Sequence, residues 1–354
     1  EIESFRKTHM PGTRDEVTAE EFFSYLANFV SPLAKVSDRI GFCFSYRAEI
    51  TPEGDGRLLR WSKQIRAPEV EGRLVGAELA ARLERRAGFK YRIAVLNDTV
   101  ATLLAGRSLG MARRFGGYVG YILGTGTNSA YVERHAAISK VKGLPREGRM
   151  AINIESGGFA RTPRSRFDEL FDATTIDPGH YLLEKMTAGG YLGGLGLTML
   201  RVAADAGLFT PATAGALRNL AELGNKDLDD FCADPDHPPE VFARMALEPE
   251  ERERVRELGT ALYCRAANLA AIHLAAVLIR GAAASDSGLP ICANLDGSTY
   301  YRTRSAEFRR QMDRRLDAIL AARGIACERT GVEEAPLIGA AVAGLSQRGY
   351  LSEE

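Results

Sequence analysis

The sequence predicts an α/β protein of two domains. Short β-rich runs alternate with longer segments of helical periodicity, and a strand–turn–strand pattern follows a switch near residue 98. The 354 residues suffice to bury two cores, and 45% hydrophobic with 26% charged residues is typical of a globular chain. The switch near residue 98 indicates a domain boundary, and a cleft between domains is a common ligand site.

Several elements are predicted before and just after the switch. Phe22, Phe23 and Leu26 recur at helical spacing and predict a helix over residues 20–33. Gly54, Asp55 and Gly56 indicate a turn. The other elements expected here are strands at 40–45 and 92–96 and helices at 75–87 and 99–105.

The rest of the chain begins with a predicted hairpin. Residues 118–123 and 129–132 are strand-like, and the turn between them reads Gly124-Thr125-Gly126-Thr127-Asn128. Beyond Pro178 the pattern is mostly helical to about residue 280, apart from a polar loop at 232–240. A strand at 289–295, a long helix after it and a last helix at 335–345 complete the prediction.

Charge and cysteine usage exclude several classes of protein. Lys plus Arg and Asp plus Glu number 46 each, so no global field favours nucleic acid or an anionic membrane. The most apolar stretch, 262–284, includes Arg265 and His273, which favours a buried helix over a membrane span and makes His273 a core residue. Scattered cysteines without a CxxC pair favour free thiols in a reducing cytoplasm: Cys43, Cys232, Cys264, Cys292 and Cys327.

Asn97-Asp98 is the first candidate for chemistry. A carboxylate at the carboxyl end of a strand lies where α/β folds place ligands, and as a general base it contributes roughly 10²–10⁴ in rate. Asp98 equally suits the role of capping the helix that follows. The residues alone leave both readings open.

The glycine–threonine turn is the second candidate. It lacks the Lys-Ser/Thr ending and the following helix of a Walker A loop. Its successive N–H groups, with the hydroxyls of Thr125 and Thr127, are suited to bind an anion. An ordinary hairpin turn is the alternative reading.

A set of polar residues in apolar surroundings is the third candidate. Carboxylate, amide and hydroxyl groups match the hydroxyls of a sugar, and a site built this way rejects molecules that leave a buried group unpaired. Singly, each residue also suits an ordinary surface position. The set is Ser45, Ser62, Lys63, Asn97, Asn128, Glu155 and Glu184.

The order of these segments resembles the eukaryotic-type hexokinase and glucokinase family along nearly the whole chain. Residues 123–131 resemble its Gly-Thr-Gly-Thr-Asn-Ala-Cys-Tyr segment, and residues 152–155 its Asn-Met-Glu-Trp-Gly. Similar matches are Phe42 to Tyr46, Trp61-Ser62-Lys63, Val70-Glu71-Gly72, Leu96 to Thr102, Asp177 to Met186, Gly190 to Gly193 and Asp296-Gly297-Ser298.

The resemblance implies ATP-dependent phosphorylation of a hexose, with glucose the expected sugar. It implies Asp98 as the base toward the 6-hydroxyl and the polar set above as the sugar site. It implies Mg²⁺ bridging the phosphates, as in other phosphoryl transfers, with no residue assigned as metal ligand. The implied nucleotide residues are Gly124, Thr125, Gly126 and Thr127 at the phosphates, Asp296, Gly297 and Ser298 near adenosine, and Gly339.

The resemblance also implies a fold, the actin-like (ribonuclease-H-like) ATPase fold of two α/β domains. The small domain is expected at 1–98 plus 339–354, without its N-terminal phosphate-binding segment, and the large domain at 99–338. Because the family's Leu-Asp-Leu-Gly-Gly-Thr-Asn segment is absent, the fragment is expected to be catalytically poor, with residues missing before Glu1.

Other departures from the family concern specificity and nucleotide contacts. Arg47 replaces Pro and Gln64-Ile65 replaces Gly-Phe, which leaves the preferred hexose open, so a kinase for another sugar is a further alternative. Ser156 replaces Trp and is expected to loosen one wall of the site. Pro336 lies in the former Gly-Ser-Gly-Lys-Gly segment and lacks an N–H. A catalytically silent sugar sensor is therefore the main alternative to the enzyme.

Overall fold

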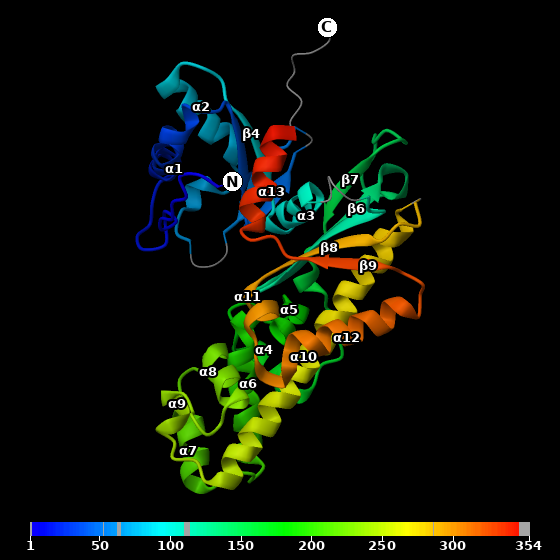
Figure 1. The fold of residues 1–354 in the computed structure, drawn as a ribbon. Coiled ribbons are helices and arrows are strands. Elements are labelled where there is room, and N and C mark those ends of the chain that lie inside the picture. Colours follow the sequence, from blue (N-terminus) through cyan, green and yellow to red (C-terminus); the bar gives the residue numbers. More distant parts are fainter. Residues whose placement is uncertain (1, 52, 62–64, 110–113, 286, 347–354) are drawn as a thin grey trace. The chain divides into compact units, whose positions relative to one another are not determined.

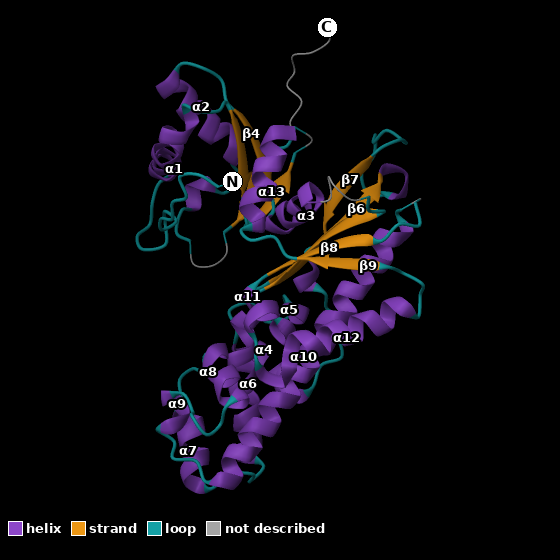
Figure 2. Cartoon of the chain, viewed as in Figure 1, coloured by secondary structure: helices purple, strands orange, loops and turns teal. Residues whose placement is uncertain are grey.

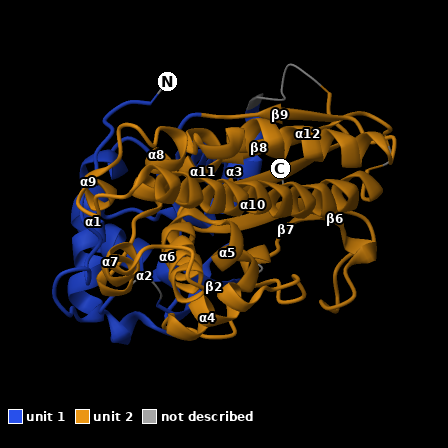
Figure 3. Ribbon diagram, turned by 90° about the horizontal axis from the view of Figure 1, so that it is seen from below, with its two compact units in different colours: residues 1–108, 333–354 blue, residues 109–332 orange. Residues whose placement is uncertain are grey.

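The computed structural model describes residues 2–51, 53–61, 65–109, 114–285 and 287–346. The chain forms two compact units, residues 1–108 with 333–354 and residues 109–332 (Figure 3). The helix that follows residue 97 and the last helix both group with the first unit. The division predicted at residues 98 and 338 stays a prediction.

The first unit combines helices with two small sheets. Strands β1 (Arg39–Cys43) and β4 (Arg92–Leu96) pair in parallel, and β2 (Arg47–Ile50) pairs antiparallel with β3 (Gly56–Arg60). The predicted helices and β1 and β4 are confirmed, whereas the β2–β3 hairpin around the predicted turn was not expected. The helices are α1 (Ala19–Ala34), α2 (Val75–Ala87), α3 (Asp98–Leu109) and α13 (Ala335–Ser346), with a short 3₁₀ turn at Pro68–Val70.

Local chemistry sets the ends of these helices. Thr18 and Glu21 form a capping box at the start of α1, each side chain bonding to the other residue's backbone N–H. Gly88 ends α2 in the left-handed conformation, with φ 76°, which a residue without Cβ adopts at little cost. The apolar face of α1 then buries Phe22 and Phe23 completely.

Helix α13 lies unusually close to its neighbours in the first unit. A Cβ on Gly41 of β1 would lie 1.7 Å from the Ala340 carbonyl oxygen, and one on Gly339 would lie 1.8 Å from that of Ala101. Both glycines are therefore required for this helix to pack against β1 and α3.

The second unit is built on a five-stranded mixed sheet (Figures 1 and 2). The strand order is β7-β6-β5-β8-β9, in which β5, β8 and β9 run parallel and β6 and β7 antiparallel to their neighbours. Strands β7 and β9 were not predicted. The bounds are β5 (Gly117–Leu123), β6 (Thr127–Arg134), β7 (Arg149–Asn153), β8 (Ile291–Asp296) and β9 (Cys327–Thr330).

Helix α10 (Pro249–Ala283) forms the centre of the helical part of the second unit. It packs against α12 (Phe308–Ala321) and against the sheet (Figure 1). Its length and composition alone would allow a membrane span, but 61% of its most apolar window is buried inside the protein. The predicted buried helix is confirmed. The other helices are α4 (Arg166–Thr174), α5 (Leu182–Thr187), α6 (Gly189–Asp205), α7 (Pro211–Asn219), α8 (Asn225–Ala233), α9 (Glu240–Ala243) and α11 (Ser298–Arg302), with 3₁₀ turns at His135–Ala137, Ser156–Gly158 and Ser305–Glu307.

Candidate functional site

Most of the predicted site residues of the second unit lie along one edge of its sheet, where the ends of several strands meet. The register brings the carboxyl ends of β5, β7 and β8 and the amino end of β6 to the same edge. The chain leaves or enters the sheet there at Leu123, Thr127, Asn153 and Asp296. Parallel α/β sheets bind ligands beyond their carboxyl ends, so this edge is where a ligand is expected.

The glycine–threonine turn is tied to the N-terminus of α6. Gly189 N donates to the Gly124 carbonyl at 2.8 Å and Gly190 N to the Thr125 carbonyl at 3.0 Å. The turn itself is shorter than predicted, because Thr127 and Asn128 already pair within β6. Within the described part of the chain, the backbone N–H groups of Thr125 and Gly126 have no hydrogen-bond partner, so the turn keeps two donors for an anion.

Glu184 of α5 closes over this turn. One of its carboxylate oxygens accepts a hydrogen bond from Thr127 N at 2.8 Å. A Cβ on Gly126 would lie 2.7 Å from that oxygen, and one on Gly157 would lie 3.1 Å from it. The two glycines therefore give the carboxylate room between the turn and the loop after β7.

The segment predicted to lie near adenosine packs against the same turn. Gly297 has φ 112°, and a Cβ there would lie 2.4 Å from the carbonyl group of Leu123. The hydroxyl of Thr299 donates to the Gly124 carbonyl at 2.7 Å. The structure thus brings Asp296, Gly297 and Ser298 beside the proposed phosphate turn within one unit.

Asn128 and Glu155 are joined by a residue that the sequence did not single out. The Asn128 amide donates to Asn153 Oδ1 at 2.8 Å, and the Asn153 amide donates to Glu155 Oε1 at 2.6 Å. Glu155 adopts the left-handed conformation, with φ 54°, which is uncommon for a residue with a side chain and clusters at functional sites. The signal for Asn153 was its place in the 152–155 motif.

Ser156, which was expected to loosen one wall of the site, is held there by hydrogen bonds. Its side chain is buried and accepts a hydrogen bond from the Ser129 hydroxyl at 2.8 Å. Its backbone N–H donates to Asn128 Oδ1 at 3.2 Å. The serine therefore fixes the loop by hydrogen bonds where the family motif has an indole.

Lys185, which follows Glu184, is held by a buried polar cluster. Its ammonium group lies 2.7 Å from Asp172 Oδ1, 2.7 Å from Thr175 Oγ1 and 3.0 Å from Asp177 Oδ1. Burial raises the pKa of Asp172, but hydrogen bonds from Lys185 and a backbone N–H outweigh it, and the net pKa is lowered. The cluster anchors the start of α5 and with it Glu184.

In the first unit, Ser45, Asn97 and Asp98 follow the carboxyl ends of the paired strands β1 and β4. The Asn97 side chain accepts the Thr99 N–H at 2.8 Å, so Asn97 rather than Asp98 caps α3. Asp98 is partly buried, and one of its carboxylate oxygens accepts a hydrogen bond from the Thr99 hydroxyl at 3.2 Å. Ser62 and Lys63 lie outside the described residues.

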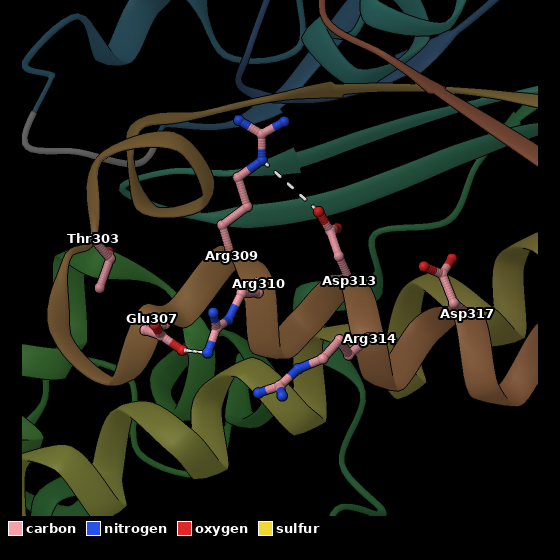
Figure 4. Close-up of a pocket in the computed structure, with 7 residues that line it drawn as sticks. All are labelled: Thr303, Glu307, Arg309, Arg310, Asp313, Arg314 and Asp317. Atoms are coloured by element: carbon pink, nitrogen blue, oxygen red, sulfur yellow. Dashed lines mark ion pairs between the residues drawn. The ribbon is translucent and has the colours of Figure 1, made fainter.

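Two further features bear on ligands. Among the described residues no group of three or more His, Cys, Asp or Glu side chains is placed to hold a metal ion. A pocket of about 410 Å³ lies along α12 (Figure 4), but it is lined by three arginines and three acidic side chains, so the lining carries no net charge. Arg309 lies 3.8 Å from Asp313, and Arg310 pairs with Glu307. Its lining residues are Thr303, Glu307, Arg309, Arg310, Asp313, Arg314 and Asp317.

Comparison with known proteins gives one consistent family. Two models described as hexokinase match residues 118–346 and 2–108. Hexokinase-1 of Nicotiana tabacum is 32% identical over 301 residues, which are 78% of this chain and 59% of the tobacco protein. Hexokinase-2 of Homo sapiens is 33% identical over 297 residues, 78% of this chain and 31% of the human protein. The chain thus spans less than two thirds of the length of these relatives.

Solved structures agree. A Schistosoma mansoni hexokinase complexed with glucose aligns over 96% of this chain and 78% of its own, with a TM-score of 0.76 and 27% identity. A hexokinase of the ROK class from Thermus thermophilus, at 17% identity and a TM-score of 0.54, shares the fold alone. The predicted actin-like ATPase fold is confirmed, and the chain belongs to the hexokinase family.

Proposed function

We propose that this protein transfers the γ-phosphoryl group of ATP to the 6-hydroxyl of a hexose, with glucose as the first substrate to test. The observation that carries the proposal is the sheet edge of the second unit. There the turn that carries the N–H groups of Thr125 and Gly126 lies beside Asp296-Gly297-Ser298, and Glu184 and the Asn128–Asn153–Glu155 series adjoin it. Backbone N–H groups that can bind an anion suit a phosphate, and the carboxylate and amide groups beside them suit a polyol.

Each group has a part in the proposed reaction. Thr125 N and Gly126 N bind phosphate oxygens, and Asn128, Glu155 and Glu184 match sugar hydroxyls. Ser45 and Asn97 add sugar contacts, and Asp98 accepts the proton of the attacking hydroxyl. Phosphoryl transfer needs mainly this positioning and charge neutralisation.

Mg²⁺ is part of the proposal. Magnesium ions in phosphoryl-transfer enzymes are held by phosphate oxygens and water with one or two carboxylates, and do not need a cage of protein ligands. A donor set without a cluster of three acidic or histidine side chains among the described residues suits that mode. The ion supplies neutralisation of the charge that develops on the phosphates.

The free cysteines support a proposal for where the protein works. All five cysteines carry free thiols, as described in the structure. Cys232 and Cys327 each have a pKa raised to about 12 by burial, so neither is a reactive thiolate. We place the protein in a reducing compartment, the cytoplasm.

Asp98→Asn tests the proposed base. We expect kcat with glucose and MgATP to fall roughly 10²–10⁴-fold, because the amide does not accept the hydroxyl proton. The sugar dissociation constant should stay within a few-fold. Asp38→Asn is the matched control, since Asp38 is a surface carboxylate of the same unit that pairs with Arg92 at 2.6 Å.

Two readouts separate catalysis from binding. Turnover is followed by coupled detection of ADP, and sugar binding by calorimetry or by the fluorescence of Trp61, the single tryptophan. Trp61 contacts Tyr46, with ring centroids 4.8 Å apart, and precedes the predicted sugar residues Ser62 and Lys63. Unchanged turnover in Asp98→Asn rules this residue out as the base. Sugar binding without turnover in the unmodified protein supports the sensor instead.

A further inference from the structure

A buried imidazole is connected to the proposed sugar site by hydrogen bonds within the second unit. His273 of α10 lies with Nε2 3.1 Å from the Ser129 hydroxyl oxygen. Ser129 is fully buried, and Ser156 and His273 are 7% and 8% exposed, so bulk water does not compete for these bonds. The continuous series runs His273, Ser129, Ser156, Asn128, Asn153 and Glu155.

Proton counting gives this series one direction. The single hydroxyl proton of Ser129 is donated to Ser156 Oγ at 2.8 Å, so it is not available to His273. His273 must then donate from Nε2–H, and Nδ1 becomes an acceptor. Nδ1 is buried without a hydrogen-bond partner in the described part of the protein, which leaves Ser129 as the one polar contact of the ring.

The series ends by fixing the side chain of Asn128. Asn128 Oδ1 accepts from Ser129 N at 2.7 Å and from Ser156 N at 3.2 Å, with the Ser156 hydroxyl 3.5 Å away. With its oxygen engaged, the amide group of Asn128 is directed to Asn153, and Asn153 in turn to Glu155. The orientation of two proposed sugar ligands therefore depends on groups that no sugar reaches.

The two serines distinguish this chain from the family motifs. Ser129 stands where the phosphate segment of the family has Ala, and Ser156 where the following motif has Trp. The two serine side chains bond to each other, and the Ser129 hydroxyl also lies within hydrogen-bond distance of His273. Two polar replacements that bond to each other in a buried place are a coupled feature, because either one alone loses this hydrogen bond.

We propose that His273 is a positioning residue for hexose binding, which acts through Ser129 and Ser156 to hold Asn128 and Glu155 in the arrangement that receives the sugar. The inference rests on the proposed function, since it concerns the same sugar site. It assigns a role to a histidine of the core helix and to two buried serines. Packing alone would not require any of these three side chains to be polar.

Kinetics of the full chain provide the first test. We expect Ser129→Ala and His273→Leu to raise the KM for glucose about five- to tenfold, the effect of about one lost hydrogen bond, with kcat within about twofold and the KM for ATP unchanged. His273→Gln, whose amide nitrogen mimics Nε2, should stay near the unmodified value. Thr198→Ala is the matched control, because its hydroxyl bonds to the Gly194 carbonyl, at 3.0 Å, within α6.

The double variant tests whether His273 and Ser129 act as one unit. The double variant Ser129→Ala with His273→Leu should have a KM for glucose no higher than that of the more affected single variant, because both substitutions break the same series. Additive effects, or a KM equal to that of Thr198→Ala, would overturn the inference while leaving the proposed kinase intact.

A second measurement decides the inference even where no turnover is found. We expect faster solvent exchange of the Asn128 side-chain amide and the Ser156 N–H in Ser129→Ala and His273→Leu than in His273→Gln, measured by NMR without sugar. Where the unmodified protein shows no turnover, the inference is decided by exchange alone. Equal exchange in all four proteins overturns it.

Discussion

Lowering the pH should destabilise this protein through His273, by an amount that its burial sets. Burial lowers the pKa of His273 to about 4, against an ordinary value of 6.5. Below pH 6.5 the His273 imidazole is therefore protonated in the unfolded chain but stays neutral in the folded protein until the pH approaches 4. The stability due to the neutral imidazole is fully present above pH 6.5 and is lost as the pH falls toward 4.

The magnitude follows from the two pKa values. The difference between 6.5 and about 4 corresponds to about 3 kcal/mol in the free energy of unfolding, of which about 2 kcal/mol is lost by pH 5. The variant His273→Gln carries no titrating group at this position. Between about pH 7.5 and about pH 5, the unmodified protein should lose about 2 kcal/mol more than this variant.

Urea unfolding followed by far-UV circular dichroism measures this difference, because most helices belong to the second unit. NMR of the imidazole protons gives the pKa directly, and only five histidines need to be resolved. An imidazole of His273 that titrates near 6.5, or equal losses of stability in both proteins, would refute the assignment of a buried, neutral ring.

Two further predictions concern packing in each unit. Asp172→Asn removes the carboxylate that lies 2.7 Å from the ammonium of Lys185, a residue only 2% exposed. We expect the free energy of unfolding, measured by circular dichroism, to fall by about 3 kcal/mol. Asp177 Oδ1 remains 3.0 Å from the ammonium, which keeps the loss at the lower end for a broken buried pair. A loss below about 1 kcal/mol would contradict it. Gly41→Ala places a Cβ 1.7 Å from the Ala340 carbonyl oxygen, so α13 must move. We expect the free energy of unfolding to fall by about 3 kcal/mol, measured by urea unfolding with tryptophan fluorescence. An unchanged unfolding midpoint would show that the helix does not pack as described.

Elements whose signals are local were predictable from the sequence. The helix at 75–87 and the strand at 92–96 match the structure at both ends. In the helix, an amphipathic repeat is followed at once by Gly88, whose left-handed conformation stops it. The strand is apolar and bounded by the helix that Asn97 caps. Local signals therefore suffice to predict both elements.

The strands that were missed depend on their partners. Strand β7 (Arg149–Asn153) begins with two exposed residues, and β9 (Cys327–Thr330) is a four-residue strand with charged residues in it. Neither run is apolar enough to predict a strand alone. Both lie at the edges of the five-stranded sheet, where β6 and β8 supply the pairing that the local sequence does not.

The candidate site divides in the same way. Motif spacing predicted the glycine–threonine turn, Asp296-Gly297-Ser298 and Glu184, and the structure brings these three together. Spacing could not predict that Asn153 links Asn128 to Glu155, because that link depends on the register of β6 against β7. The contact of His273 with Ser129 joins residues 144 positions apart and has no local signal.

The replacement of an indole by hydroxyl groups changes the kind of restraint on the loop after β7. An indole fills volume, and packing of that kind resists displacement without fixing the direction of any polar group. The Ser129–Ser156 pair fixes direction, because each hydroxyl has one proton and the order of donors leads from His273 to Asn128. The left-handed backbone of Glu155, which costs about 1 kcal/mol or more, needs such a restraint to persist beside the 3₁₀ turn at Ser156–Gly158. A chain with Ser156 and without Ser129 or His273 would have neither the packing nor the direction, so we expect these three residues to depend on one another.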